Sequence, residues 1–161
     1  MYWGKSYSDL EIENALKKNE ENIAWSKQTT EEVAETAALK LKSGQILGWF
    51  QGGCEAGPRA LGNRSILADP RRKNMKDILN SRVKFRESFR PFAPSVLQEY
   101  AKDYFETDGT EYPFMLFVHP VKESKKSVIP AVTHVDGTAR IQTVNEKDNP
   151  VYYGLINAFY R

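Results

Sequence analysis

Apolar residues recur at helical and strand spacings along most of the chain and predict short helices and strands. Two helices near the N-terminus are predicted by capping boxes, in which Ser or Thr is followed three residues later by Glu: Ser8 with Glu11, and Thr29 with Glu32. The second of these helices is expected to stop at Gly44, because glycine suits the residue after a helix end.

The remaining chain predicts a mixture of strands and helices. Strand patterns cover residues 45–50, 65–68, 112–118 and 140–144. Helical patterns cover residues 72–82, 100–105 and 149–161, whereas 93–97 fits either a strand or a helix start and 128–132 fits an extended segment. Because the order is mixed without strict alternation, we expect an α/β or α+β sheet protein.

Composition narrows the class of protein. The length of 161 residues and the 40% hydrophobic content predict one domain with a sizeable hydrophobic core. One cysteine excludes an internal disulfide and fits a reducing cytosol. No apolar run is long enough for a membrane span and no signal-peptide pattern is present, so we expect a soluble, cytoplasmic protein.

Positive charge is concentrated in one stretch of an otherwise nearly neutral chain. Residues 51–95 hold ten lysines and arginines against four acids, although the whole chain carries only +2. The stretch opens with a glycine-rich loop, residues 51–65, that lacks both the Lys-Ser/Thr end of a P-loop and the dinucleotide glycine spacing. Cations beside a permissive backbone favour an anionic ligand.

Several cations are candidates for contact with that anion. Arg59 follows Gly57-Pro58, whose stiff backbone can present a guanidinium in a fixed direction, although a surface ion pair is an equally good interpretation. Lys84, Arg86 and Arg90 share a face if extended; if helical, only Arg86 and Arg90 stack.

Such converging cations repel one another unless an anion or an acid lies among them, and Glu87 is one possible partner. Three interleaved phenylalanines are expected to anchor the segment to a core: Phe85, Phe89 and Phe92. Arg140, which begins a strand after a turn, is a further candidate anion contact.

Other residues favour structural roles. His134 and Asp136 are too few for a metal site in a chain with two histidines and one cysteine, and Asp136 suits the turn before Gly137. Cys54 is interpreted as a small filler. The aromatic stripe is expected in the core rather than as a stacking platform: Tyr100, Tyr104 and Phe105.

Longer motifs carry a resemblance. They read GWFQG at 48–52, E-x-GPRALGNRSILADP at 55–70, VKFR-x-x-FRPFAPSVL at 83–97 and PAVTHVDGTARIQTV at 130–144, with Tyr2-x-Gly4 at the start. In these motifs the chain resembles, over nearly its whole length, the C-terminal domain of the carbamoyltransferase family, which includes nodulation and antibiotic O-carbamoyltransferases.

The resemblance implies a fold and an activity. The expected fold is YrdC-like, a twisted mixed sheet flanked by helices, spanning residues 1–161 and incomplete at its C-terminal end. The implied activity is binding of ATP, with Mg²⁺ on the nucleotide, and of carbamoyl phosphate to form carbamoyl-adenylate. Arg59, Lys84, Arg90 and Arg140 are the implied substrate contacts, with Lys84 and Arg90 as catalytic residues.

The resemblance also implies a partner. In the family, a separate N-terminal domain similar to the actin-like ATPases passes the carbamoyl group to an acceptor hydroxyl, so this chain is not expected to transfer it unaided. The alternatives are a nucleic-acid (RNA) binding module using the basic groove, and a scaffold that binds nothing well. The small net charge and the absence of exposed stacking motifs disfavour nucleic acid.

Overall fold

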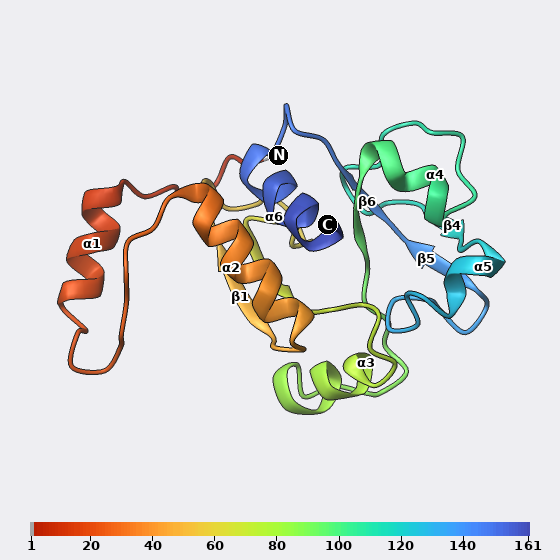
Figure 1. The fold of residues 1–161 in the computed structure, drawn as a ribbon, viewed down its shortest axis with the longest axis horizontal. Coiled ribbons are helices and arrows are strands. Elements are labelled where there is room, and N and C mark those ends of the chain that lie inside the picture. Colours follow the sequence, from red (N-terminus) through yellow and green to blue (C-terminus); the bar gives the residue numbers. More distant parts are fainter. Residues whose placement is uncertain (1) are drawn as a thin grey trace.

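A computed structural model describes residues 2–161 as a body of helices and small sheets from which an arm projects (Figure 1). The expected α+β class is confirmed. The longer helices are α1 (Asp9–Lys17), α2 (Thr30–Lys42) and α6 (Pro150–Tyr160). The shorter segments are α3 (Met75–Ile78), the π-helical turn η1 (Leu79–Val83), the 3-10 turn η2 (Gln98–Tyr100), α4 (Ala101–Tyr104) and α5 (Glu123–Lys126). Within residues 2–161 no helix has the length and apolarity to cross a bilayer.

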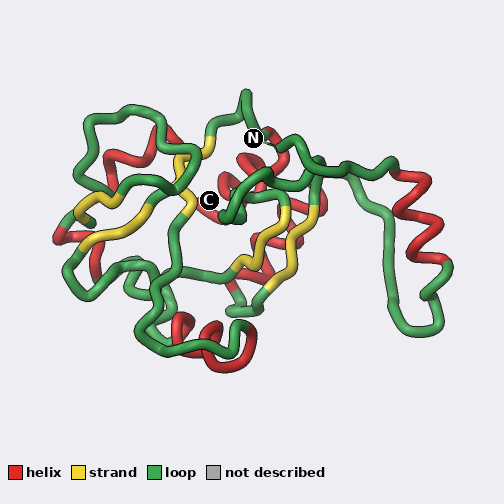
Figure 2. The backbone as a smooth tube through the Cα atoms, turned by 180° about the vertical axis from the view of Figure 1, so that it is seen from behind, coloured by secondary structure: helices red, strands yellow, loops and turns green. Residues whose placement is uncertain are grey.

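The strands form three two-stranded pairs rather than the single twisted sheet implied by the resemblance. The strands are β1 (Leu47–Phe50), β2 (Arg64–Leu67), β3 (Ser95–Leu97), β4 (Val118–Pro120), β5 (Thr138–Arg140) and β6 (Gln142–Val144). β1 pairs with β2 and β4 with β5 in antiparallel fashion, and β3 pairs with β6 in parallel. Figure 2 shows the β1–β2 pair well apart from the other strands.

The predicted strand 140–144 is divided at Ile141. β5 ends at Arg140 and belongs to the β4 pair, whereas β6 begins at Gln142 and belongs to the β3 pair. Ile141 is fully buried between the two. The chain therefore passes directly from one sheet to the other, and Arg140 lies at the junction.

The predicted strand 112–118 is wrong except at its last residue. Pro113 has no N–H group for a sheet ladder, and Met115 has a φ of 53°, which interrupts any extended run. Only Val118 enters β4. Residues 128–132, expected to be extended, form turns instead.

The core beneath β1 and β2 is built from α2 and α6, which pack against each other (Figure 1). Val33 and Leu39, two apolar residues of α2, are exposed. The buried face consists instead of Ala34, Ala37, Ala38 and Leu41. Small alanines allow the two helices to approach closely, which positions the β1–β2 pair and the loop between its strands.

A second core lies among β3, α4 and β5. Phe105 is its largest side chain and is only 1% exposed, and Tyr100 and Tyr104 pack against it half-buried. The core interpretation of the aromatic stripe is therefore confirmed. A smaller cluster of Met75, Leu79 and Ala131 fixes α3 and η1 against the rest.

Candidate functional site

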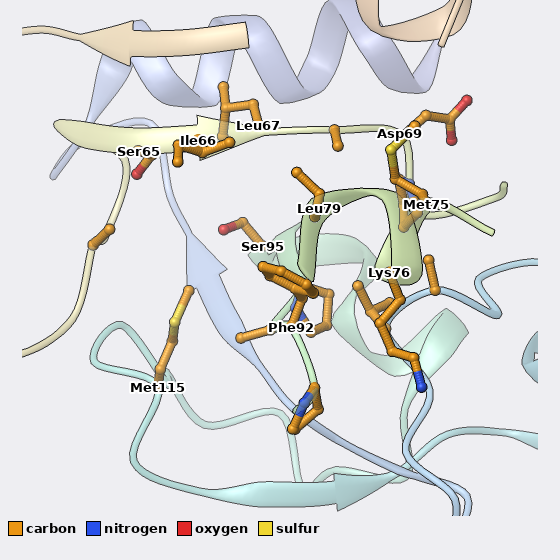
Figure 3. Close-up of a pocket in the computed structure, with 18 of the residues that line it drawn as sticks. Ser65, Ile66, Leu67, Asp69, Met75, Lys76, Leu79, Phe92, Ser95 and Met115 are labelled. Atoms are coloured by element: carbon orange, nitrogen blue, oxygen red, sulfur yellow. The ribbon is translucent and has the colours of Figure 1, made fainter. Parts of the chain in front are cut away.

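A cavity of about 360 Å³ lies between β2, α3, η1, β3 and α6. Figure 3 shows Ser65, Ile66 and Leu67 of β2 along one side, with Leu79, Phe92 and Met115 facing them. The volume falls in the range of small-molecule sites, roughly 300–1,000 Å³. The cavity is therefore large enough for an organic ligand.

Four of the cations singled out from the sequence line this cavity: Arg59, Lys84, Arg86 and Arg140. They come from the β1–β2 loop, from the segment after η1 and from the end of β5, and Lys76 of α3 joins them. The fold thus brings together charges that are far apart in sequence.

Arg59, Lys84 and Arg140 are available to a ligand. Within residues 2–161, no side-chain hydrogen bond or ion pair engages these three residues. The Nε atom of Arg140 is buried and has no hydrogen-bond partner among the described residues. Burial, and then the neighbouring charge of Arg59, lowers the pKa of Arg140. An anion in the cavity would satisfy the buried nitrogen and offset the repulsion.

Arg86 is held in place by protein groups. Its Nε donates to Oδ1 of Asn80 at 2.7 Å, and its guanidinium lies 4.5 Å from the ring centroid of Phe92. Asn80, only 1% exposed, also donates through Nδ2 to the backbone oxygens of Arg90, at 3.0 Å, and Ser88, at 3.3 Å. Asn80 therefore shapes the whole segment, a role that local sequence spacing gives no sign of.

Arg90 does not line the cavity with the others. Its Nε donates to Oε2 of Glu87 at 2.9 Å in an exposed ion pair. Two of the three predicted phenylalanine anchors are wrong, since Phe85 is 82% exposed and Phe89 is 76% exposed. The reason is that Phe85 has a φ of 47°, so the backbone follows neither the extended nor the helical spacing.

Glu55 organises the loop that carries Arg59, a role that was not predicted from the sequence. Its Oε1 accepts hydrogen bonds from the backbone N–H groups of Leu61, at 2.8 Å, Asn63, at 2.9 Å, and Arg64, at 3.2 Å. Burial opposes ionisation of this carboxyl, but the backbone donors outweigh it and hold its pKa below the usual value.

A buried hydrogen-bond chain joins α6 to the same loop. The hydroxyl of Tyr152 donates to Oγ of Ser95 at 2.9 Å, and Ser95 Oγ donates to Oε1 of Gln142 at 2.9 Å. Gln142 Nε2 then donates to the carbonyl of Leu61 at 2.9 Å. Burial raises the pKa of Tyr152 to about 12, so the hydroxyl remains a donor.

A second polar network fixes the ends of the loop. Asn149 Oδ1 accepts from Nε2 of Gln51 at 2.7 Å, and Asn149 Nδ2 donates to Oδ1 of Asn63 at 3.1 Å and to the hydroxyl of Tyr2 at 3.0 Å. Asn149 also caps α6 by accepting from the N–H of Tyr152. Its capping role is visible in the sequence, but its contacts with the loop are not.

Asp136 makes the turn contact predicted for it, and His134 and Cys54 do not line the cavity. Asp136 Oδ1 accepts from the N–H of Thr138 at 3.0 Å, as expected of a turn residue, and His134 is not among the residues lining the cavity. Within residues 2–161 no cluster of side chains is suited to hold a metal ion. Cys54 is half-buried beside Glu55.

Comparison with known proteins places the chain. Residues 38–161 match the family model described as carbamoyltransferase C-terminus. The chain is 53% identical over 165 residues to nodulation protein NolO of Bradyrhizobium diazoefficiens, which covers 99% of this chain and 29% of that protein. It is 51% identical over 166 residues to nodulation protein NolNO of Sinorhizobium fredii, covering 99% of this chain and 24% of the relative.

A third relative has an enzyme name. The chain is 46% identical over 119 residues to a 3'-hydroxymethylcephem-O-carbamoyltransferase of Amycolatopsis lactamdurans, covering 74% of this chain and 22% of that protein. The chain spans less than a third of the length of each of these three relatives. With a family match over residues 38–161 and these identities, the chain belongs to the carbamoyltransferase C-terminal family.

Proposed function

We propose that the cavity binds ATP and carbamoyl phosphate and forms carbamoyl-adenylate, which a separate N-terminal domain with an actin-like ATPase fold passes to an acceptor hydroxyl. The observation that carries the proposal is the gathering around one cavity of Arg59, Lys84 and Arg140, whose side chains have no polar partner within residues 2–161. The family membership and the carbamoyltransferase name of one relative supply the chemical class.

The arrangement suits a reaction between two anions. In the proposed reaction water first cleaves carbamoyl phosphate to carbamate and inorganic phosphate. A carbamate oxygen then attacks the α-phosphorus of ATP while the bond to pyrophosphate breaks. Fixed cations offset the repulsion between the reactants and stabilise the charge on the leaving pyrophosphate. Lys84, exposed at the cavity edge, is suited to this role because its charge is not neutralised by an ion pair in the described chain.

Arg90 would act only after a small rearrangement. Its exposed ion pair with Glu87 is worth roughly 0–1 kcal/mol, so a polyphosphate can compete for the guanidinium at little cost. Arg90 therefore remains part of the proposed site as a residue recruited by the ligand, while Arg59, Lys84 and Arg140 are in place beforehand.

Mg²⁺ would arrive on the nucleotide. Among the described residues, Asp69 is the one carboxylate that lines the cavity, and Arg71 engages both of its oxygens, at 2.8 and 3.1 Å through Nε. The donor set therefore fits an ion carried by phosphate oxygens rather than one held by the protein. Bound there, the ion would neutralise part of the phosphate charge.

Calorimetric titration of ATP and of carbamoyl phosphate into the purified chain tests the proposal. We expect Arg59→Ala, Lys84→Ala and Arg140→Ala each to weaken ATP binding at least tenfold, about 1.4 kcal/mol or more. The control is Lys40→Ala on the exposed face of α2, which removes the same charge from a residue that does not line the cavity.

Unchanged ATP affinity in all three cavity variants would refute the site. Release of pyrophosphate when carbamoyl phosphate and ATP are both present would support adenylation. Retention of RNA on a filter at low salt, with no binding of ATP, would instead favour the nucleic-acid alternative.

A further inference from the structure

In the loop between β1 and β2, Arg59 lies on a short exposed stretch. A hydrogen bond joins the two residues that flank this stretch, Glu55 and Leu61. Residues 56–60 are all exposed, and the cavity lining includes Pro58, Arg59 and Ala60 but not Glu55. The closure is made by Glu55 Oε1, which accepts the N–H of Leu61 immediately after the exposed stretch. The position of Arg59 therefore depends on a residue that does not itself face the ligand space.

The side chain of Arg64, whose charge is opposite to that of Glu55, also holds the loop together. The guanidinium of Arg64 donates to the carbonyl oxygens of Gln51, at 2.5 Å, Asn63, at 2.8 Å, and Gly52, at 3.1 Å. It also lies 3.5 Å from the ring centroid of Phe50. Arg64 is thus engaged by the loop, whereas Arg59 is left free of polar partners among residues 2–161.

The bonds to Glu55 are of the strong kind. An ionised carboxylate that accepts backbone N–H groups makes shorter and stronger hydrogen bonds than a neutral acceptor. Three donors meet one oxygen atom of Glu55, and they belong to residues on the far side of the exposed stretch. Without this acceptor, those N–H groups would lose their partner and the stretch its closure.

We propose that Glu55 is a positioning residue for the anion site: by closing the loop from Glu55 to Arg64 it holds Arg59 at the edge of the cavity. This inference rests on the proposed function, because it concerns the binding of ATP at that site. Glu55 acts through Arg59 and does not touch the ligand, so its effect should disappear when Arg59 is removed.

A double-mutant cycle on ATP affinity tests the proposal. The variants are Glu55→Ala, Arg59→Ala and the double variant, titrated with ATP by calorimetry. We expect Glu55→Ala to weaken ATP binding roughly tenfold and Glu55→Gln, which keeps an acceptor oxygen without the charge, to weaken it less. In the Arg59→Ala background, Glu55→Ala should cause no further loss, because coupled residues are not additive.

The matched control is Glu35→Ala on the exposed face of α2, which removes the same charge without touching the loop and should leave ATP affinity unchanged. Circular dichroism establishes that each variant is folded. If Glu55→Ala does not fold, Glu55→Gln and its double variant with Arg59→Ala complete the same cycle.

Distinct results separate this inference from the proposed function. Wild-type affinity in Glu55→Ala and Glu55→Gln, together with a loss in Arg59→Ala, would overturn the role of Glu55 and keep the site. Additive losses in the double variant would also overturn it, because Glu55 would then act independently of Arg59. Failure of the wild-type chain to bind ATP would refute the proposed function itself.

Discussion

The β1–β2 loop, residues 51–63, and the N-terminal arm, residues 6–28, both lie outside the strands, but they are held in opposite ways. The arm contains α1, which buries no residue and projects from the body in both views (Figures 1 and 2). Its conformation rests on local bonds, such as that from the N–H of Ser8 to Oε2 of Glu11 at 2.8 Å.

The loop depends on partners far along the chain. Gln142 contacts it from the start of β6 and Asn149 from the N-cap of α6, and Glu55 closes it from within. A segment can therefore take its shape mainly from local bonds, whereas global stability comes from contacts between distant residues. Substitutions in the two regions should therefore have very different effects on unfolding.

The largest effect is expected at Gly62. Its φ is 104°, and a Cβ atom there would lie 2.3 Å from a ring atom of the buried Tyr152. Gly62→Ala should lower the free energy of unfolding by about 3 kcal/mol or more, measured by urea denaturation. Gly154→Ala is the control, because it lies inside α6 with open space at its Cβ and should raise stability by about 0.5–1 kcal/mol. Equal midpoints for the two variants would contradict the packing of the loop.

An intermediate effect is expected at Asn149. Asn149→Ala leaves the buried Asn63 and the half-buried Gln51 without a shared partner and should lower the free energy of unfolding by roughly 2–3 kcal/mol. The matched variant in the arm is Asn19→Ala, which removes one exposed bond from Nδ2 to the carbonyl of Ala15 and should change stability by about 0.5 kcal/mol at most. Similar losses in both would erase the distinction between the regions.

The smallest global effect is expected at the cap of α1. Ser8→Ala removes the acceptor for the N–H of Glu11 and should reduce the local stability of α1 by about 1 kcal/mol. Amide hydrogen exchange should accelerate within α1 while the urea midpoint of the body stays unchanged. A matching drop in the urea midpoint would show that α1 unfolds together with the body.

Local chemistry made some elements predictable. The boxes at Ser8 and Thr29 form as expected, with both reciprocal bonds, and α2 ends before Gly44, whose φ is 90°. Asn149 and Pro150 begin the last helix. These signals involve residues within four positions of one another, so one sequence suffices to find them.

Long-range choices were not predictable in the same way. Nothing local to residues 140–144 indicates that the chain changes sheets at Ile141, because the residues on both sides of it are extended. Arg90 and Phe89 were placed by assuming a regular backbone after Val83, and the positive φ of Phe85 breaks that assumption.

The residues of the candidate site also divide into those with a local sequence signal and those whose role depends on long-range contacts. Arg59, Lys84 and Arg140 were recognisable from the glycine loop, the charge concentration and the turn before β5, and the structure places them around one cavity; their role as substrate contacts stays a prediction. Glu55, Asn80 and Gln142 were missed because each is a polar residue whose partners are set by the folded backbone.

A single residue, Ile141, connects β5 to β6, so no flexible loop separates the two strand pairs that it joins. With Ile141 enclosed on every side, a tilt of the β4–β5 pair must be passed on to the β3–β6 pair instead of being absorbed by a flexible connection. A displacement of Arg140, the residue before Ile141, would therefore move the β4–β5 pair and the β3–β6 pair together.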